Sequence, residues 1–182
     1  PIDADIDGRA VRLTNLDKVL YPSGFTKAEV VDYYARVAQW IIPHLAGRCI
    51  TFRRFPDGTD KDGFFEKRCP KHRPKWVKTT NVRAGPNAGN IDFCVCDGRP
   101  TLVWMAQLAA IELHPSLSLG RAPTRPTVLA FDLDPGPSAG MTDCCRVALD
   151  IRDVLTDLDL EAWAKTSGSK GLQLYLPLNT PH

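Results

Sequence analysis

Two aspartates that end an apolar run are the residues best suited to chemistry in this chain. Residues 128–136 read Val-Leu-Ala-Phe-Asp-Leu-Asp-Pro-Gly, which places the acids at Asp132 and Asp134. Side chains alternate between the faces of a strand, so both carboxylates would project on one side, with Cα atoms roughly 6.6 Å apart. This arrangement suits divalent cations held together with phosphate oxygens, as two-metal phosphoryl transfer requires. An acidic turn that caps a buried strand is the alternative.

A second polar segment, at residues 166–175, reads Thr-Ser-Gly-Ser-Lys-Gly-Leu-Gln-Leu-Tyr. Small residues let backbone N–H groups approach a phosphate, and Lys170 would supply a positive charge for it. The segment is not a Walker A loop, because the spacing differs and no helix pattern follows. Alone it would indicate a flexible hairpin turn. Together with the two aspartates it predicts a site that holds metal on one side and a triphosphate on the other.

Composition and charge are consistent with a nucleic-acid partner. The 182 residues are 43% hydrophobic, enough for a substantial core, and one compact domain is the default expectation. Residues 48–83 contain 11 Lys and Arg against 4 Asp and Glu, whereas residues 130–161 contain 8 acids against 2 arginines. A basic and an acidic segment suit a polyanion held beside a cation-dependent site. Two differently charged solvated faces are the alternative.

The absence of a long apolar run and of a signal sequence predicts an intracellular protein. No run approaches the ~20 apolar residues of a membrane helix, and no signal-peptide pattern opens the chain. In a reducing compartment the six cysteines are expected to be free thiols. Four side chains could instead bind zinc, although their Cys-x-Cys spacing is shorter than most structural zinc motifs use: Cys69, His72, Cys94 and Cys96.

The periodicity predicts an α+β fold, with mixed sheets flanked by helices. A capping box of Thr26 and Glu29 opens a helix that we expect to end at Pro43. A second helix is expected over 101–113, stopped by Pro115, and a third near 141–158. Strands are expected at 9–15, 49–55, 91–96, 162–167 and 171–176, with an irregular stretch between the second and the third.

Four motifs in sequence order resemble the polymerase domain of bacterial ligase D, in the archaeo-eukaryotic primase superfamily. They are Leu-Asp-Lys-Val-Leu-Tyr-Pro at 16–22, Phe-Phe-Glu-Lys at 64–67, Phe-Asp-Leu-Asp-Pro-Gly at 131–136 and Ser-Gly-Ser-Lys-Gly-Leu at 167–172. The resemblance covers nearly all of the chain, and the chain is similar to the stand-alone members of the family. It implies one primase-polymerase domain over 1–182, in the bacterial cytoplasm and near the nucleoid during repair.

The resemblance also implies roles for single residues in a nucleotide site. Asp132 and Asp134 match the catalytic, metal-binding acids, which would hold Mn²⁺ or Mg²⁺. His114 matches a histidine beside the sugar and phosphates of the nucleotide, and Arg53 falls on the same path. The contacts of the second motif with the nucleotide would come from Ser167, Ser169, Lys170, Gly171 and Gln173.

For DNA, the resemblance implies contacts of this protein with the 5′-phosphate on the far side of a gap and with the template strand. Lys18 and Lys27 match a lysine pair that holds a 5′-phosphate, and Arg54 falls on the template path. Phe64 and Phe65 match aromatics that lie against the template base, where stacking contributes about 1–3 kcal/mol per base. As alternatives, the lysines would be ordinary surface residues, the phenylalanines core residues, and His114 a helix C-terminal cap.

Two departures from the family pattern affect the expected activity. Gln173 stands where the second motif usually has histidine, so we expect weaker triphosphate binding. The family has a third metal-binding acid on a later strand, and this sequence stops at His182. We therefore expect the C-terminal portion with that acid to be absent.

The resemblance implies a DNA-dependent nucleotidyltransferase that fills gaps and extends broken ends in non-homologous end joining, with ribonucleotides preferred. Its expected partners are gapped or broken DNA with a 5′-phosphate, nucleoside triphosphates, DNA ligase and end-binding repair proteins, and no membrane. The alternatives are a non-catalytic module that binds DNA ends, and a different metal-dependent phosphotransfer enzyme acting on small substrates.

Overall fold

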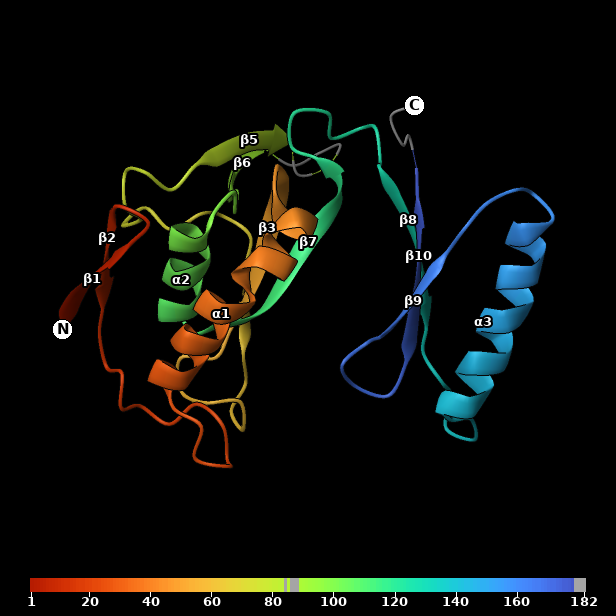
Figure 1. The fold of residues 1–182 in the computed structure, drawn as a ribbon, viewed down its shortest axis with the longest axis horizontal. Coiled ribbons are helices and arrows are strands. Elements are labelled where there is room, and N and C mark those ends of the chain that lie inside the picture. Colours follow the sequence, from red (N-terminus) through yellow and green to blue (C-terminus); the bar gives the residue numbers. More distant parts are fainter. Residues whose placement is uncertain (84, 86–88, 179–182) are drawn as a thin grey trace. The chain divides into compact units, whose positions relative to one another are not determined.

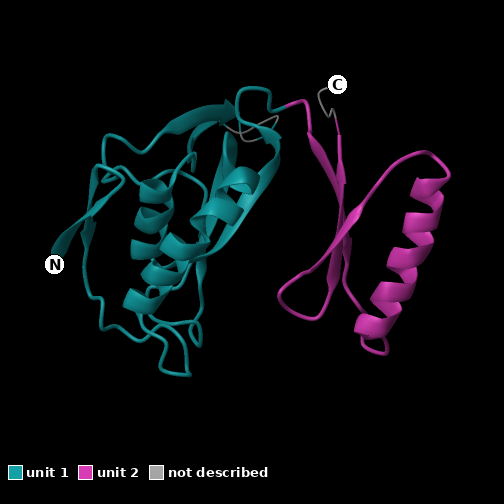
Figure 2. Cartoon of the chain, in the orientation of Figure 1, with its two compact units in different colours: residues 1–123 teal, residues 124–182 magenta. Residues whose placement is uncertain are grey.

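The computed structural model describes residues 1–83, 85 and 89–178. The chain divides into two compact units, residues 1–123 and residues 124–182 (Figure 2). Each unit packs helix against antiparallel strands around a core of its own (Figure 1). The predicted α+β fold class is confirmed. No helix in the described part of the chain is both long enough and apolar enough to span a membrane.

Unit 1 is built around a five-stranded antiparallel sheet, with a separate N-terminal hairpin of β1 and β2. Strand β3 pairs with β7 on one side and with β4 and β6 on the other, and β6 pairs with β5. The elements are β1 (Ile2–Ile6), β2 (Arg9–Leu13), α1 (Lys27–Leu45), β3 (Arg48–Arg54), β4 (Phe64–Glu66), β5 (Thr79–Arg83), β6 (Asn90–Cys94), α2 (Arg99–Gln107) and β7 (Ala110–Leu119).

Helix α1 begins at the predicted capping box. The Thr26 hydroxyl accepts from the backbone N–H of Glu29, and the Glu29 carboxylate accepts from the backbone N–H of Thr26 at 2.7 Å. The predicted end at Pro43 is wrong, because the helix continues to Leu45. Leu45 is buried in the core, and a proline in the last turn removes only one backbone donor.

The predicted helix over 101–113 is wrong beyond its second turn. Helix α2 ends at Gln107, Ala109 adopts a positive φ of 54°, and β7 begins at Ala110. Strand β7 pairs with β3 along most of its length, and this long-range pairing overrides the helical periodicity of the segment. His114 therefore lies on a strand, so the alternative that it caps a helix is also wrong.

The stretch predicted to be irregular contains β4 and β5, whose strand character comes from pairing with β3 and β6. The expectation that all cysteines are free is wrong as well, since Cys69 and Cys94 form a disulfide. The Cys69 N–H donates to the carbonyl of Asp92 at 2.7 Å, which places Cys69 beside β6. The disulfide removes Cys69 and Cys94 from the four side chains that could bind zinc. The described residues contain no group of three His, Cys, Asp or Glu side chains that could hold a metal ion.

Unit 2 is a three-stranded antiparallel sheet with a helix on one face. Strand β10 (Leu172–Pro177) lies between β8 (Val128–Leu133) and β9 (Trp163–Thr166). Helix α3 (Met141–Thr156) packs Cys144 and Ala148 against the apolar side chains of β8 and β10. Because strand side chains alternate, the polar residues of β8 and β10 point to the opposite face.

Candidate functional site

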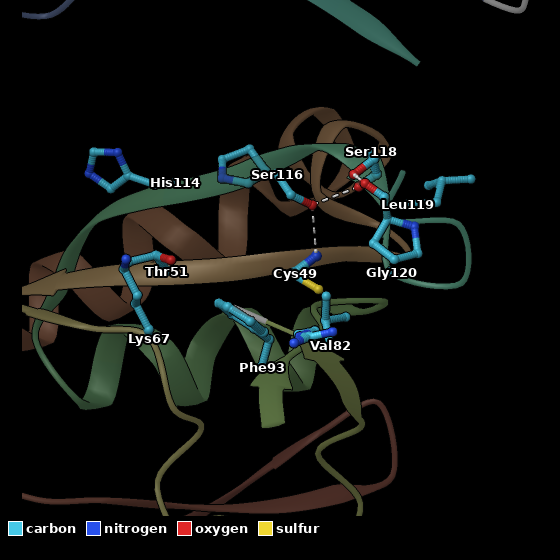
Figure 3. Close-up of a pocket in the computed structure, with 13 residues that line it drawn as sticks. Cys49, Thr51, Lys67, Val82, Phe93, His114, Ser116, Ser118, Leu119 and Gly120 are labelled. Atoms are coloured by element: carbon cyan, nitrogen blue, oxygen red, sulfur yellow. Dashed lines mark hydrogen bonds between the residues drawn. The ribbon is translucent and has the colours of Figure 1, made fainter. Parts of the chain in front are cut away.

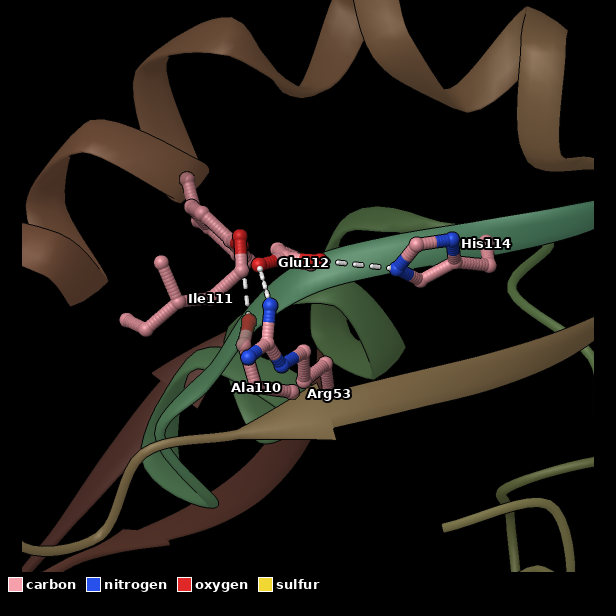
Figure 4. Close-up of polar contacts among 6 residues, drawn as sticks. Arg53, Ala110, Ile111, Glu112 and His114 are labelled. Atoms are coloured by element: carbon pink, nitrogen blue, oxygen red, sulfur yellow. Dashed lines mark hydrogen bonds and ion pairs between the residues drawn. The ribbon is translucent and has the colours of Figure 1, made fainter. Parts of the chain in front are cut away.

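Three side chains of unit 1 form a chain of hydrogen bonds across β3 and β7 (Figure 4). Arg53 Nη1 donates to Glu112 Oε1 at 3.0 Å, and His114 Nε2 donates to Glu112 Oε2, also at 3.0 Å. Strand register places Arg53 opposite Glu112 and Thr51 opposite His114. The Tyr34 hydroxyl of α1 donates to the carbonyl of Ala110 at 2.7 Å and so fixes the start of β7. The fold thus brings the predicted Arg53 and His114 together through one carboxylate.

Glu112 was not among the predicted site residues. Glu112 lies two residues before His114 on β7 and so shares a strand face with it, whereas the predicted helix would have placed the two side chains on different faces. Its two oxygens hold an arginine and a histidine at the same time. Glu112 therefore sets the position of both predicted nucleotide contacts.

Phe65 provides an exposed aromatic surface beside this group. Its ring lies 5.5 Å from the His114 ring, and the Arg53 guanidinium lies 5.5 Å from the Phe65 centroid. Phe65 is 60% exposed, so one side of the ring is available to a planar partner. The alternative that both phenylalanines are core residues is wrong, since Phe64 is 46% exposed.

A pocket of about 420 Å³ in unit 1 borders His114 (Figure 3). Thr51, Lys67 and Phe93 also line it. The Ser116 hydroxyl in its wall is used internally, because it accepts from the Cys49 N–H at 3.2 Å and donates to the carbonyl of Ser118 at 2.6 Å. Lys67 and Arg83, both exposed, are cations that line the pocket.

The predicted lysine pair differs strongly in burial. Lys27 is only 7% exposed, and burial first, then the charges of Lys18 and Arg54, hold its pKa below the ordinary value of 10.5. Lys18 is exposed and forms an ion pair with Asp57 at 2.9 Å. The alternative that both are ordinary surface lysines is therefore wrong for Lys27. A buried cation beside two other cations is a favourable position for an added anion.

The Arg54 guanidinium makes hydrogen bonds and a ring contact within the protein. It donates to Glu66 and to the carbonyl of Leu108, both at 2.8 Å, and its guanidinium lies 5.3 Å from the Phe64 centroid. This arginine orients Phe64 and adds positive charge near Lys27. A direct contact of Arg54 with a template strand stays a prediction.

In unit 2, Asp132 lies near the C-terminal end of β8, Asp134 follows directly after the strand, and both are exposed. Neither forms an ion pair within the described residues. A Cβ atom at Gly171 would lie 2.5 Å from the backbone carbonyl oxygen of Leu133 and 2.8 Å from Asp134 Oδ1, so glycine lets this turn approach the end of β8 and the Asp134 carboxylate. Two exposed carboxylates without cationic partners fit a hard divalent cation such as Mn²⁺ or Mg²⁺.

The β9–β10 hairpin adjoins the end of β8, because Leu172 pairs with Leu133. Its turn is closed by Ser167, whose hydroxyl oxygen accepts from the N–H groups of Ser169 at 3.3 Å and Gly171 at 3.1 Å. These two amides are therefore already used. Lys170 is exposed, with no ion pair in the described chain, so it remains the predicted phosphate contact of this turn.

Comparison with known proteins agrees with this architecture. The family of the LigD primase-polymerase domain matches residues 26–182. The multifunctional non-homologous end joining protein LigD of Mycolicibacterium smegmatis is 45% identical over 174 residues, which cover 94% of this chain and 23% of that protein. The bifunctional LigD of Bacillus subtilis is 28% identical over 170 residues, which cover 93% and 27%. The chain spans about a quarter of the length of these relatives.

Among solved structures, the chain is similar to the polymerase domain from Mycobacterium tuberculosis ligase D in complex with DNA. The TM-score is 0.84 at 40% identity, and the match covers 94% of this chain and 62% of that chain. The fold is thus that of a polymerase domain. More particularly, the chain belongs to the LigD primase-polymerase domain family.

Proposed function

We propose that this protein is a metal-dependent DNA-directed nucleotidyltransferase that adds nucleotides at gaps and broken ends during non-homologous end joining. The observation that carries the proposal is the pair Asp132 and Asp134, which are exposed and without cationic partners beside a lysine-bearing hairpin. The relatives' names, which refer to end joining, and the DNA complex of the M. tuberculosis domain support it.

In this proposal Asp132 and Asp134 hold Mn²⁺ or Mg²⁺, which when bound neutralises charge on the phosphate oxygens. Lys170 attracts the triphosphate, and the hydroxyl proton of Ser167 is available to a phosphate oxygen. His114 and Arg53, held by Glu112, contact the nucleotide. The primer 3′-hydroxyl attacks the α-phosphorus, a new P–O bond forms, and pyrophosphate leaves.

Recognition of the DNA end is assigned to unit 1. Lys27 and Lys18 hold the 5′-phosphate on the far side of the gap, and the phosphate relieves the repulsion between these cations. Phe64 and Phe65 stack against a template base. Gapped DNA, nucleoside triphosphates with ribonucleotides preferred, a ligase and end-binding repair proteins are the proposed partners.

Primer extension on a gapped duplex with a 5′-phosphate, supplied with Mn²⁺, tests the proposal. We expect Asp132→Ala and Asp134→Ala each to reduce extension at least a hundredfold, because a lost carboxylate weakens metal binding and phosphate neutralisation. Affinity for the DNA should stay within about twofold, since phosphate contacts on the duplex dominate it. The control Asp150→Ala removes an exposed acid of α3 and should extend normally. Full-rate extension by Asp132→Ala would refute the metal role.

A module that binds DNA ends without chemistry is the second candidate. It is favoured by the finding that the two site acids have no third metal-ligating side chain clustered with them in the described chain. Tight binding of 5′-phosphorylated gapped DNA, with no nucleotide added under any metal, would support this candidate.

A further inference from the structure

Gln173, the residue that departs from the family pattern, contacts one of the two site acids. We infer that Gln173 is a positioning residue that holds Asp132 in its metal-binding orientation, and that it is not a contact of the triphosphate. The inference rests on the proposed function, since it assumes that Asp132 binds metal.

Strand register places the two side chains on one face of the sheet. Gln173 of β10 is directly opposite Asp132 of β8, and its Nε2 donates to Asp132 Oδ1 at 3.2 Å. Directly opposed residues of antiparallel strands have Cβ atoms about 4.5–5.5 Å apart, within reach of a glutamine. The contact therefore follows from the pairing of β8 and β10.

The Asp132 carboxylate determines which end of the Gln173 amide faces it, and Tyr175 bonds the other end. The Tyr175 hydroxyl donates to Gln173 Oε1 at 2.9 Å. An ionised carboxylate only accepts hydrogen bonds, so the NH₂ group of Gln173 faces Asp132 and its carbonyl oxygen is left to accept from Tyr175. The two hydrogen bonds run in one direction: Tyr175 donates to Gln173, and Gln173 donates to Asp132.

The partner of Asp132 is neutral, although a cation lies close by. Lys165 of β9 is opposite Gln173 on the other side, but its Nζ donates to the carbonyl of Thr166 at 3.2 Å and lies 5.8 Å from the Tyr175 ring centroid. A cation bound to Asp132 would compete with a divalent ion for the same carboxylate. A neutral amide restrains Oδ1 and leaves the full negative charge to the metal.

Binding of Mn²⁺ to the 182-residue chain, followed by electron paramagnetic resonance with and without a nucleoside triphosphate, gives a readout independent of activity. We expect Gln173→Leu to weaken Mn²⁺ binding about tenfold, because partners that orient metal ligands typically contribute 10–100-fold. Tyr175→Phe keeps the ring and should weaken binding in the same direction by less. Gln39→Leu, the same change on the exposed side of α1, should leave it unaltered.

Extension kinetics separate positioning from phosphate contact. A positioning role predicts that Gln173→Leu lowers kcat and raises the half-saturating Mn²⁺ concentration, with the nucleotide KM within about twofold of wild type. A higher nucleotide KM with unchanged Mn²⁺ affinity would overturn the inference. The Asp132→Ala variant distinguishes the two failures: if it binds Mn²⁺ as well as wild type, the proposed metal site fails, and if it alone loses Mn²⁺, only the role of Gln173 fails.

Discussion

Lys27 has the most unusual environment of the charged side chains assigned to DNA binding. Burial and the neighbouring Lys18 and Arg54 lower its pKa below 10.5. Between that lowered pKa and 10.5 the unfolded chain binds more protons than the folded one, so this group makes stability rise with pH in that window. Binding of a phosphate has the opposite dependence, because it requires the charged form of Lys27.

The preference for 5′-phosphorylated over 5′-hydroxyl gapped DNA should therefore fall as pH rises through the lowered pKa of Lys27. Below about pH 6 the preference should also weaken, since the phosphate loses its second charge. Fluorescence anisotropy with the two DNAs across this pH range measures the ratio of affinities.

Lys27→Met, which keeps the apolar stem, should reduce that ratio about tenfold at neutral pH, because a charge-assisted hydrogen bond contributes about 1.5–3 kcal/mol. It should also abolish the alkaline decline. Lys71→Met, at an exposed position, is the matched control and should leave the ratio unchanged. A normal ratio in Lys27→Met would show that the 5′-phosphate binds elsewhere.

Glu112→Gln tests whether one carboxylate holds Arg53 and His114. The three side chains are 38–48% exposed, so the Arg53–Glu112 ion pair and the His114–Glu112 hydrogen bond contribute little to stability, and the free energy of unfolding should change by less than about 1 kcal/mol. The nucleotide KM should rise several-fold because both contacts lose their anchor. Urea unfolding and extension kinetics measure the two effects, with Glu161→Gln as the control. A large loss of stability with an unchanged KM would contradict the assignment.

At the scale of elements, short-range sequence signals predicted the start of α1 but not the boundary between α2 and β7. The capping box located the start of α1 because its hydrogen bonds join residues three apart. The α2–β7 boundary could not be obtained this way, since β7 is a strand through its pairing with β3, more than 50 residues earlier in the chain.

The candidate site shows the same division. Asp132 and Asp134 could be identified as candidate metal ligands from their spacing alone, but β8 ends at Leu133, so strand alternation places only Asp132 on the polar face of the sheet. The contact of Gln173 with Asp132 depends on the register of β10 against β8. The role of Glu112 depends likewise on β7 being a strand. Residue types were readable from the sequence, and their hydrogen-bond partners required the strand pairing.

Gly171 lies so close to the end of β8 that an added methyl group would clash with it. A Cβ atom there would lie 2.5 Å from the carbonyl oxygen of Leu133. Gly171→Ala should therefore destabilise unit 2 by about 1–3 kcal/mol, as overpacking does, and displace Asp134. Chemical unfolding and Mn²⁺ binding measure these effects. Gly136→Ala is the control, because nothing lies within 4 Å of its Cβ position. An unaltered Mn²⁺ affinity in Gly171→Ala would argue against a fixed position for Asp134.

At the scale of the whole molecule, charge is divided between the two units. The basic residues 48–83 belong to unit 1, and the acidic residues 130–161 belong to unit 2. This division matches the proposed assignment of DNA-end recognition to unit 1 and of metal binding to unit 2. That one primase-polymerase domain spans residues 1–182 stays a prediction.

The Cys69–Cys94 disulfide lies within unit 1 and should stabilise that unit alone. It closes a loop with a sequence separation of 25, and loss of such a constraint costs about 3–4 kcal/mol in the chain-entropy model. Hydrogen exchange should show that Cys69→Ser lowers protection in β3, β6 and β7 and leaves β8 and β10 unchanged. Cys145→Ser, at an exposed free thiol, is the control. Equal loss of protection in both units would show that their stabilities are coupled.

The ion pair between Lys18 and Asp57 has a consequence for the choice of DNA ends. Lys18 is already paired with Asp57, so a DNA terminus that binds Lys18 must displace this carboxylate. A phosphate dianion carries more charge than the aspartate, whereas a bare hydroxyl terminus carries none. In the proposed function Asp57 therefore competes with a terminal phosphate for Lys18, and because this ion pair is exposed, the competition amounts to at most about 1 kcal/mol and adds a small preference for phosphate over hydroxyl ends.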